Sequence, residues 1–163
     1  MSQRPYKMAR SYSSYTINRC NYHTYSYGAN KATQCYGVSV NARTSSYSSV
    51  KDKNPVSEEI TYYGRIMDII ELNYSNEGKV VLFKCDWVKT IGVRSLEPYG
   101  IKQVNFKHLQ NVEDISSEPF ILAVHARQVY YLQDPVEQDW QAVVCPTTRE
   151  YYDMEPANYD EDV

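Results

Sequence analysis

The feature that most constrains the fold is a pair of apolar segments joined by a short turn. Residues 60–74 read ITYYGRIMDIIELNY and residues 79–88 read KVVLFKCDWV, and both are rich in β-branched and aromatic side chains. Between them, Asn76, Glu77 and Gly78 have the composition of a turn. The sequence therefore predicts two long antiparallel strands that form a hairpin.

The second of these segments has one face that suits a core better than the other. Successive side chains of a strand point to opposite faces. The predicted core face carries Val81, Phe83, Cys85 and Trp87. The opposite face mixes apolar and charged side chains, namely Val80, Leu82, Lys84, Asp86 and Val88. Gly64, inside the first segment, predicts a bulge or a sharp bend.

Further β signals follow this hairpin and one precedes it. Short strands are expected at residues 33–42, 102–109, 120–132 and 140–146, with turn chemistry at Asp134, Pro135 and Asp139. Residues 121–128 could instead form a short helix, because Ala, Leu, Arg and Gln favour helix. The predicted fold is mainly β: a small, strongly bent antiparallel sheet, or a barrel of the SH3-like or BAH-like (bromo-adjacent-homology-like) type.

The chain of 163 residues is long enough for one core with tails. Residues 1–32 contain almost no aliphatic side chains and predict a flexible basic, tyrosine-rich arm, mobile or docked. Residues 33–57 are expected to hold a short strand and a linker. Residues 58–148 are expected to form the β-barrel-like core, and residues 149–163 an acidic, disordered tail.

The charges of the chain are strongly segregated. Seven of the 17 basic residues and none of the 20 acidic residues lie before Asp52. A basic segment rich in tyrosine predicts nucleic-acid binding, because cations contact phosphates and rings stack on unpaired bases. The residues predicted to bind are Arg4, Lys7, Arg10, Arg19, Tyr22, Lys31 and Arg43. The alternatives are a solvated leader, or an arm paired with the acidic tail of the same molecule.

No apolar stretch reaches the roughly 18 residues of a membrane span, and the first residues lack the apolar run of a signal peptide. A soluble, intracellular protein without a membrane partner is therefore expected. The four cysteines are far apart and form no CxxC pair, which predicts reduced thiols.

Residues capable of catalysis or metal binding are present but scattered. A metal-dependent nuclease would need converging carboxylates, and the candidates are Asp68, Glu71, Asp86 and Asp134. A zinc site could use Cys20, His23 and Cys35, and a thiol nucleophile would pair Cys85 with His108 or His125. None of these sets has the spacing of a known site, so we expect no catalytic residues, no metal, no cofactor and no small-molecule substrate.

A second kind of binding site is a cage of aromatic rings. Such cages bind methylated lysine through cation–π contacts. The candidates are Tyr62, Tyr63, Trp87, Tyr130 and Tyr131. Alternation along a strand requires one ring of each Tyr-Tyr pair to point inward, so part of this set is also expected in the core.

Several motifs occur in an order that resembles a known family. They include YTINRCNYHT, TQCYGVSV, DKNPV, YYGRIMDIIELNY, KVVLFKCDWV, VNF and ARQVYYLQDP, between about Tyr15 and Met154. In order and spacing they resemble the domain of unknown function near the C-terminal end of plant CACTA (En/Spm-type) transposon proteins. The resemblance implies a transposon-derived protein that acts in the nucleus beside a transposase, and it implies no reaction.

The sequence thus favours a non-catalytic accessory module that binds nucleic acid, through its basic arm, or a protein such as a transposase or a chromatin protein. A reader of peptides or histone tails is the first alternative. A fragment of a metal-dependent nuclease is the second.

Overall fold

The protein is mainly β in a computed structural model that describes residues 9–31, 34–46, 56–74, 78–110 and 119–146. No helix within these ranges is long and apolar enough to cross a membrane. The elements are β1 (Ala9–Tyr12), β2 (Ser14–Ile17), β3 (Cys20–His23), α1 (Tyr25–Gly28), β4 (Gly37–Ser46), β5 (Val56–Tyr74), β6 (Gly78–Trp87), η1 (Thr90–Gly92), β7 (Val93–Leu96), β8 (Ile101–Val104), β9 (Phe120–Leu122), η2 (Ala123–His125), β10 (Arg127–Gln133) and β11 (Gln141–Val144).

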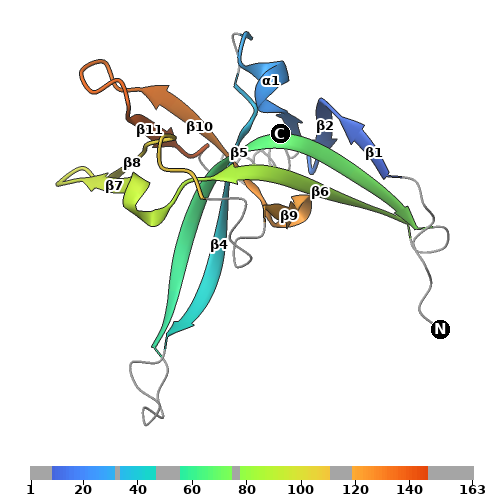
Figure 1. The fold of residues 1–163 in the computed structure, drawn as a ribbon, viewed down its shortest axis with the longest axis horizontal. Helices are drawn as coiled ribbons and strands as arrows, with labels where there is room; N and C mark the ends of the chain where they lie inside the picture. Colours follow the sequence, from blue (N-terminus) through green and yellow to red (C-terminus); the bar gives the residue numbers. More distant parts are fainter. Residues whose placement is uncertain (1–8, 32–33, 47–55, 75–77, 111–118, 147–163) are drawn as a thin grey trace, which may run out of the picture.

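The 19-residue strand β5 organises the main sheet. Its first half pairs with β4, its second half with β6, and β1 pairs with residues 69–72 beyond the start of β4. The full order is β7-β8-β11-β10-β4-β5-β6-β9, so these strands form an open sheet and do not close into a barrel. Of the two predicted architectures, the bent antiparallel sheet is therefore the one observed (Figure 1).

The predicted hairpin and its core face are confirmed. β5 and β6 pair antiparallel, and Phe83, Cys85 and Trp87 are all buried on one face of β6. The register shifts between Ile66 and Asp68, close to the bend expected at Gly64. A Cβ at Gly64 would lie 2.7 Å from the Trp87 ring, so only glycine permits this close approach.

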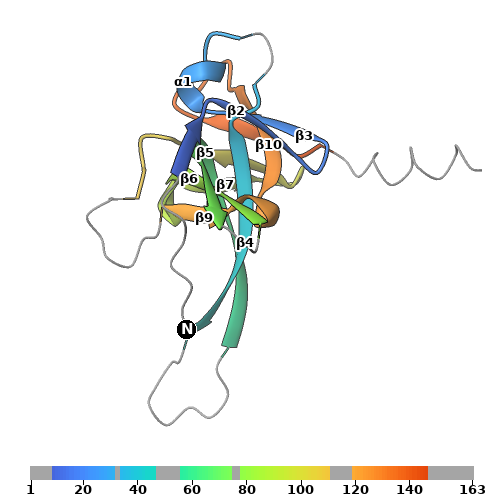
Figure 2. The ribbon, with the colours of Figure 1, turned by 90° about the vertical axis from the view of Figure 1, so that its right-hand side faces the viewer.

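The sheet has a core cluster on each face. The first contains Val38, Ile66, Ile69 and Phe83, and the β2–β3 hairpin covers it with Tyr22. The second lies where β7, β8, β10 and β11 curl over the opposite face of β4 and β5, and contains Tyr36, Tyr63, Val88, Val104, Val129 and Tyr131. Seen from the side, α1 and β2–β3 lie at one end and the β4–β5 ribbon extends from the other (Figure 2).

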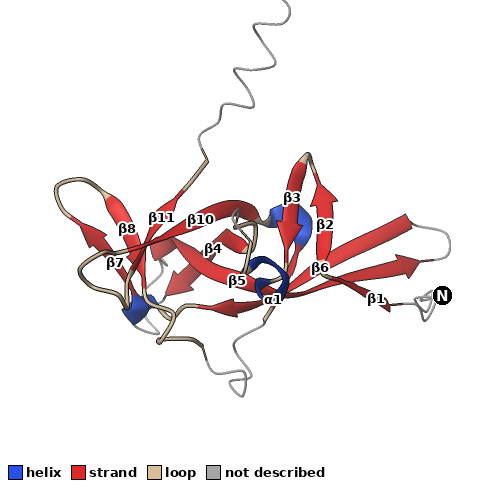
Figure 3. Cartoon of the chain, turned by 90° about the horizontal axis from the view of Figure 1, so that it is seen from above, coloured by secondary structure: helices blue, strands red, loops and turns tan. Residues whose placement is uncertain are grey.

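The segment expected to be a flexible arm is folded over residues 9–31. β1 adds to β5, the β2–β3 hairpin rises over β5 and β6 (Figure 3), and Tyr22 is only 3% exposed. The prediction counted aliphatic side chains, but here tyrosine rings supply the buried apolar surface. Tyr22 packs on Phe83 with ring centroids 4.9 Å apart.

The later strands differ from the prediction in detail. The segment 120–132 is neither one strand nor a helix, because η2 separates β9 from β10. β7 was not predicted, and β4 extends to Ser46, further than expected. The predicted acidic tail, residues 149–163, lies outside the described residues, and so does most of the predicted linker, at residues 47–55.

Candidate binding groove

β5 has a free edge along residues 59–62. β4 pairs with one edge of this segment, but β6 joins the other edge only from Gly64, which is paired with Trp87. The last backbone bond on that side runs from the Val88 N–H to the Tyr63 carbonyl, at 2.9 Å. None of the described strands pairs with this edge of residues 59–62.

The edge is free because the chain turns away from β5 at the end of β6. The Trp87 carbonyl accepts a hydrogen bond from the Gln110 N–H at 2.8 Å, and Val88 forms an isolated bridge with Leu109. The η1 turn then begins at Thr90. These contacts hold the chain after β6 against the loop following β8, and so prevent it from continuing the pairing with β5.

The backbone groups on this edge are not paired with any of the described strands. The Tyr63 carbonyl faces the β6 side, whereas the Ile66 N–H donates to the Tyr36 carbonyl on the β4 side. Backbone groups alternate between the two edges of a strand, so Glu59 and Thr61 direct their N–H and C=O groups the same way as Tyr63. Such unpaired groups accept an added strand.

A groove of about 350 Å³ runs along this edge. Valines contribute apolar surface, and hydroxyls, one carboxylate and one ammonium contribute polar groups. Burial, with the nearby Cys145, raises the pKa of Tyr63, so its phenol stays protonated at neutral pH. The lining residues are Glu59, Ile60, Thr61, Tyr62, Tyr63, Val88, Thr90, Val93 and Lys102.

The five predicted cage residues do not form one cage. Tyr62 and Tyr63 line the groove, but Trp87 is 6% exposed and Tyr131 is 1% exposed, both inside core clusters. The Tyr130 hydroxyl donates to the Gln128 amide oxygen, at 3.2 Å. Strand alternation buries one ring of each pair, which is why the set separates.

The rest of the groove was not predicted, although the sequence holds one signal for it. The first predicted strand, residues 60–74, is longer than the second, residues 79–88. A hairpin between unequal strands leaves part of the longer one without a neighbour. The opposite wall, with Thr90, Val93 and Lys102, depends on how the chain turns after Val88 and has no local signal.

The predicted nucleic-acid residues are dispersed. Arg4 and Lys7 lie outside the described residues, and so does the side chain of Arg43, whose backbone is in β4. Arg10 lies opposite Glu71 and helps to lower the pKa of that carboxyl.

Two further predicted cations lie elsewhere on the N-terminal segment. Arg19 is in the β2–β3 turn with φ of 65°, and the Lys31 ammonium sits 3.8 Å from the centre of the Tyr27 ring. The described cations of this set therefore come from three places in the chain: β1, the β2–β3 turn and the segment after α1.

The tyrosines of the N-terminal segment make contacts within the protein. Tyr12 and Tyr15 pack edge to face at 5.3 Å, and the Tyr15 hydroxyl donates to Glu71 at 2.6 Å. The Arg65 guanidinium lies 4.2 Å from the centre of the Tyr25 ring, and Tyr22 is buried. These contacts engage the rings within the fold.

The four candidate carboxylates have four separate structural roles. Asp68 accepts a bond from the Ser11 hydroxyl, and Glu71 one from Tyr15. Asp86 pairs with Arg65 at 3.6 Å. Asp134 accepts bonds from the Gln103 amide and from two backbone N–H groups of the following turn. Within the described ranges, no three His, Cys, Asp or Glu side chains are arranged to hold a metal ion, and this includes Cys20, His23 and Cys35.

The candidate thiol nucleophile lies in the core. Burial, with a smaller contribution from Asp86, raises the pKa of Cys85 well above its ordinary value, so the thiol stays protonated. His108 and His125 are both exposed. The reactive cysteine of a cysteine enzyme needs a lowered pKa, which keeps it as a thiolate.

The bond between Tyr15 and Glu71 predicts a defined pH dependence of stability. It lowers the pKa of Glu71 and raises that of Tyr15 to about 12. The lowered pKa of Glu71 stabilises the fold above the unfolded pKa near 4.5, and this stabilisation is lost in acid. The raised pKa of Tyr15 stabilises the fold below the unfolded pKa of 10.0, and this stabilisation is lost as the pH rises towards 12. The difference in unfolding free energy between wild type and Tyr15→Phe, measured in urea, should be largest between these limits. A difference of equal size in acid, at neutral pH and in alkali would contradict this assignment.

A comparison with protein families gives one match. The model of a family described as "Domain of unknown function (DUF4216)" matches residues 70–143, which include the end of β5 (residues 70–74), the strands from β6 to β10 and most of β11. Neither a curated protein nor a solved structure matches the chain. Over residues 70–143 the chain is therefore similar to a domain of unknown function, and the match does not identify an activity.

Proposed function

We propose that the chain is a non-catalytic protein-binding module that takes up an extended peptide as an additional strand on β5. The observation that carries the proposal is the free edge of residues 59–62 at the side of a groove. Added strands gain affinity from backbone hydrogen bonds and specificity from pockets for alternate side chains. Here the free edge offers the backbone groups, and the groove offers space for side chains.

The walls of the groove define the peptide that fits it. Val88 and Val93 favour an aliphatic side chain facing the second core cluster. The Lys102 ammonium, which donates to the Ser95 hydroxyl at 2.6 Å, favours an acidic side chain on the same face of the peptide. We therefore expect an extended ligand in which an aliphatic and an acidic residue are two positions apart.

The biological setting belongs to the same proposal. The resemblance to the CACTA transposon module supports a transposon-derived protein acting in the nucleus, with the peptide supplied by a transposase or a chromatin protein. The match to a domain of unknown function over residues 70–143 is compatible with it. A protein ligand is better supported than nucleic acid, because Tyr15, Tyr22 and Tyr25 are engaged inside the fold.

The test uses a proline on the free edge. Thr61→Pro removes an N–H that points away from β4, so the β4–β5 pairing is kept while strand addition is blocked. Peptides selected from a random phage-displayed library on the wild-type chain are expected to bind the variant at least about tenfold more weakly, which is the effect of one or two lost backbone bonds. Isothermal titration gives the affinities.

Thr61→Val is the matched control. It keeps the N–H and the approximate shape of the side chain and loses only the hydroxyl, which bonds the Asn41 amide oxygen at 2.7 Å. Its peptide affinity should fall far less than that of Thr61→Pro, because the backbone N–H on the free edge is kept. Selected peptides that bind Thr61→Pro as tightly as wild type, or a library without enriched sequences, would refute the proposal.

A further inference from the structure

The far half of the β5–β6 hairpin has a second apolar face, which we call the outer face. It faces away from the first core cluster, which is on the side of Ile69 and Phe83. Strand alternation and the observed register place on it Asp68, Ile70, Leu72 and Tyr74 of β5, Val80, Leu82 and Lys84 of β6, and Phe120 and Leu122 of β9.

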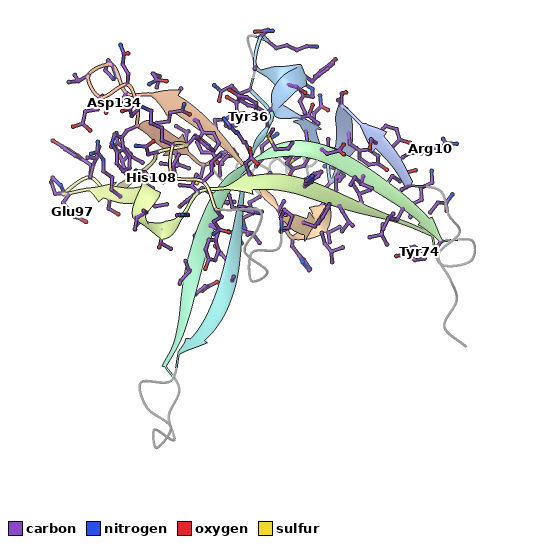
Figure 4. All side chains as sticks on the ribbon, in the orientation of Figure 1. Arg10, Tyr36, Tyr74, Glu97, His108 and Asp134 are labelled. Atoms are coloured by element: carbon purple, nitrogen blue, oxygen red, sulfur yellow. The ribbon has the colours of Figure 1, made fainter. Side chains whose placement is uncertain are left out.

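No described segment packs over the outer face. None of its apolar side chains belongs to either core cluster or packs against one. Phe120 and Leu122 are 42% and 38% exposed, and the other apolar side chains of this face are half-buried. In Figure 4, Tyr74 projects from one side of the β5–β6 arm and Arg10 lies on the other side. An antiparallel sheet with one face in water normally carries polar side chains there, so this apolar face indicates a missing layer.

We propose that a second copy of this chain covers the outer face, forming a two-fold symmetric dimer with the two sheets packed face to face. The axis would run parallel to the strands, between β5 and β6. It would place β6 of the second copy over β5, so that Ile70 contacts Leu82 of the second copy and Leu72 contacts its Val80. Aligned packing of this kind is the usual arrangement of two sheets.

The charges on this face favour a copy of the same chain. The charged side chains on it are Asp68 and Lys84, which occupy directly opposed positions in the register. The two-fold axis would place Asp68 of each copy over Lys84 of the other. The face therefore complements itself in charge, as a symmetric interface requires.

The sizes of the side chains are self-complementary in the same arrangement. Tyr74 is paired with Gly78, and no described atom lies within 4 Å of the position a Gly78 Cβ would take. The axis would place each Tyr74 ring over the Gly78 of the other copy. It would also place Leu122 over Ser11 of β1, a small exposed residue in the same row as Ile70.

Charge reversal tests this arrangement with the full chain. Sedimentation velocity should show the wild type as a dimer at micromolar concentration. Asp68→Lys and Lys84→Asp should each raise the dissociation constant at least about tenfold. In either variant, positions 68 and 84 of opposite copies carry the same charge, and the two-fold axis repeats this repulsive contact at a second place in the interface. The double variant Asp68→Lys/Lys84→Asp should restore the dimer.

Leu82→Glu and Leu132→Glu form a second, matched pair. Leu82 lies at the centre of the outer face, whereas Leu132 is 60% exposed on β10 and outside it. The first change should give a monomer with an unchanged circular dichroism spectrum, and the second should leave the dimer intact. A wild-type chain that is monomeric up to its solubility limit, or a double variant that stays dissociated, would overturn the proposal.

The inference does not depend on the groove. Thr61→Pro, which is designed to block peptide binding, should remain a dimer. Loss of the dimer in Thr61→Pro would show instead that the free edge of β5, and not the outer face, joins the two copies.

Discussion

Replacing Tyr131 with alanine is expected to lower the free energy of unfolding by about 4 kcal/mol, the range found when a buried aromatic side chain is removed. Tyr131 is 1% exposed, and its ring packs edge to face on Phe106 at 5.0 Å. Its hydroxyl donates to the Gly64 carbonyl at 2.6 Å, next to the bend of β5. The variant loses apolar contacts and also leaves that carbonyl without its partner. Urea denaturation followed by tryptophan fluorescence measures the change.

The control for this prediction is Tyr131→Phe, which keeps the ring and removes only the hydroxyl. Loss of a buried hydrogen bond that leaves an acceptor unpaired costs about 1–3 kcal/mol. The phenylalanine variant should therefore lie clearly between wild type and alanine. Equal stability of all three chains would mean that Tyr131 does not occupy the second core cluster.

Replacing Phe83 with alanine is expected to cost about 3–5 kcal/mol of folding free energy. Phe83 is fully buried in the first core cluster, where it packs on Tyr22. The variant leaves a cavity between the sheet and the β2–β3 hairpin. The loss should appear as a lower urea midpoint and as faster amide hydrogen exchange in β2 and β3.

Phe120 provides a comparison with the same residue type on the other face of the sheet. It is 42% exposed on β9, and Phe120→Ala should lower the stability of the monomer by less than about 1 kcal/mol. Phe120→Ala should instead raise the dissociation constant of the proposed dimer. Similar unfolding costs for the two alanine variants would contradict the assignment of an inner and an outer face.

The parts of the fold that the sequence predicted are those determined by local pattern. The unbroken runs of β-branched and aromatic residues on both sides of Gly78 identified β5 and β6, and strict alternation identified the buried face of Phe83, Cys85 and Trp87. A glycine inside a strand pattern, Gly64, predicted a bulge or bend, and the register shifts close to it, between Ile66 and Asp68. Such features need no knowledge of distant segments.

The parts that could not be predicted depend on contacts between distant segments. Tyr22 looked like part of a polar arm, and only its packing on Phe83 shows that a tyrosine-rich segment can complete a core. The groove requires β6 to leave β5 at Val88, which follows from contacts with Leu109 and Gln110. Of the residues named for a cage, Trp87 is buried in the first core cluster and Tyr131 in the second, as alternation along the strands had led us to expect for part of the set.

The strands at the two ends of the main sheet are very short, and this limits strand addition at those two ends. β7 has four residues and β9 has three, so neither end offers a long template for end-to-end growth into fibrils. The free edge of β5 is also short, and Thr90 of η1 and Val93 of β7 form the opposite wall of the groove beside it. Under the proposed function, a single extended strand would enter there, between β5 and that wall.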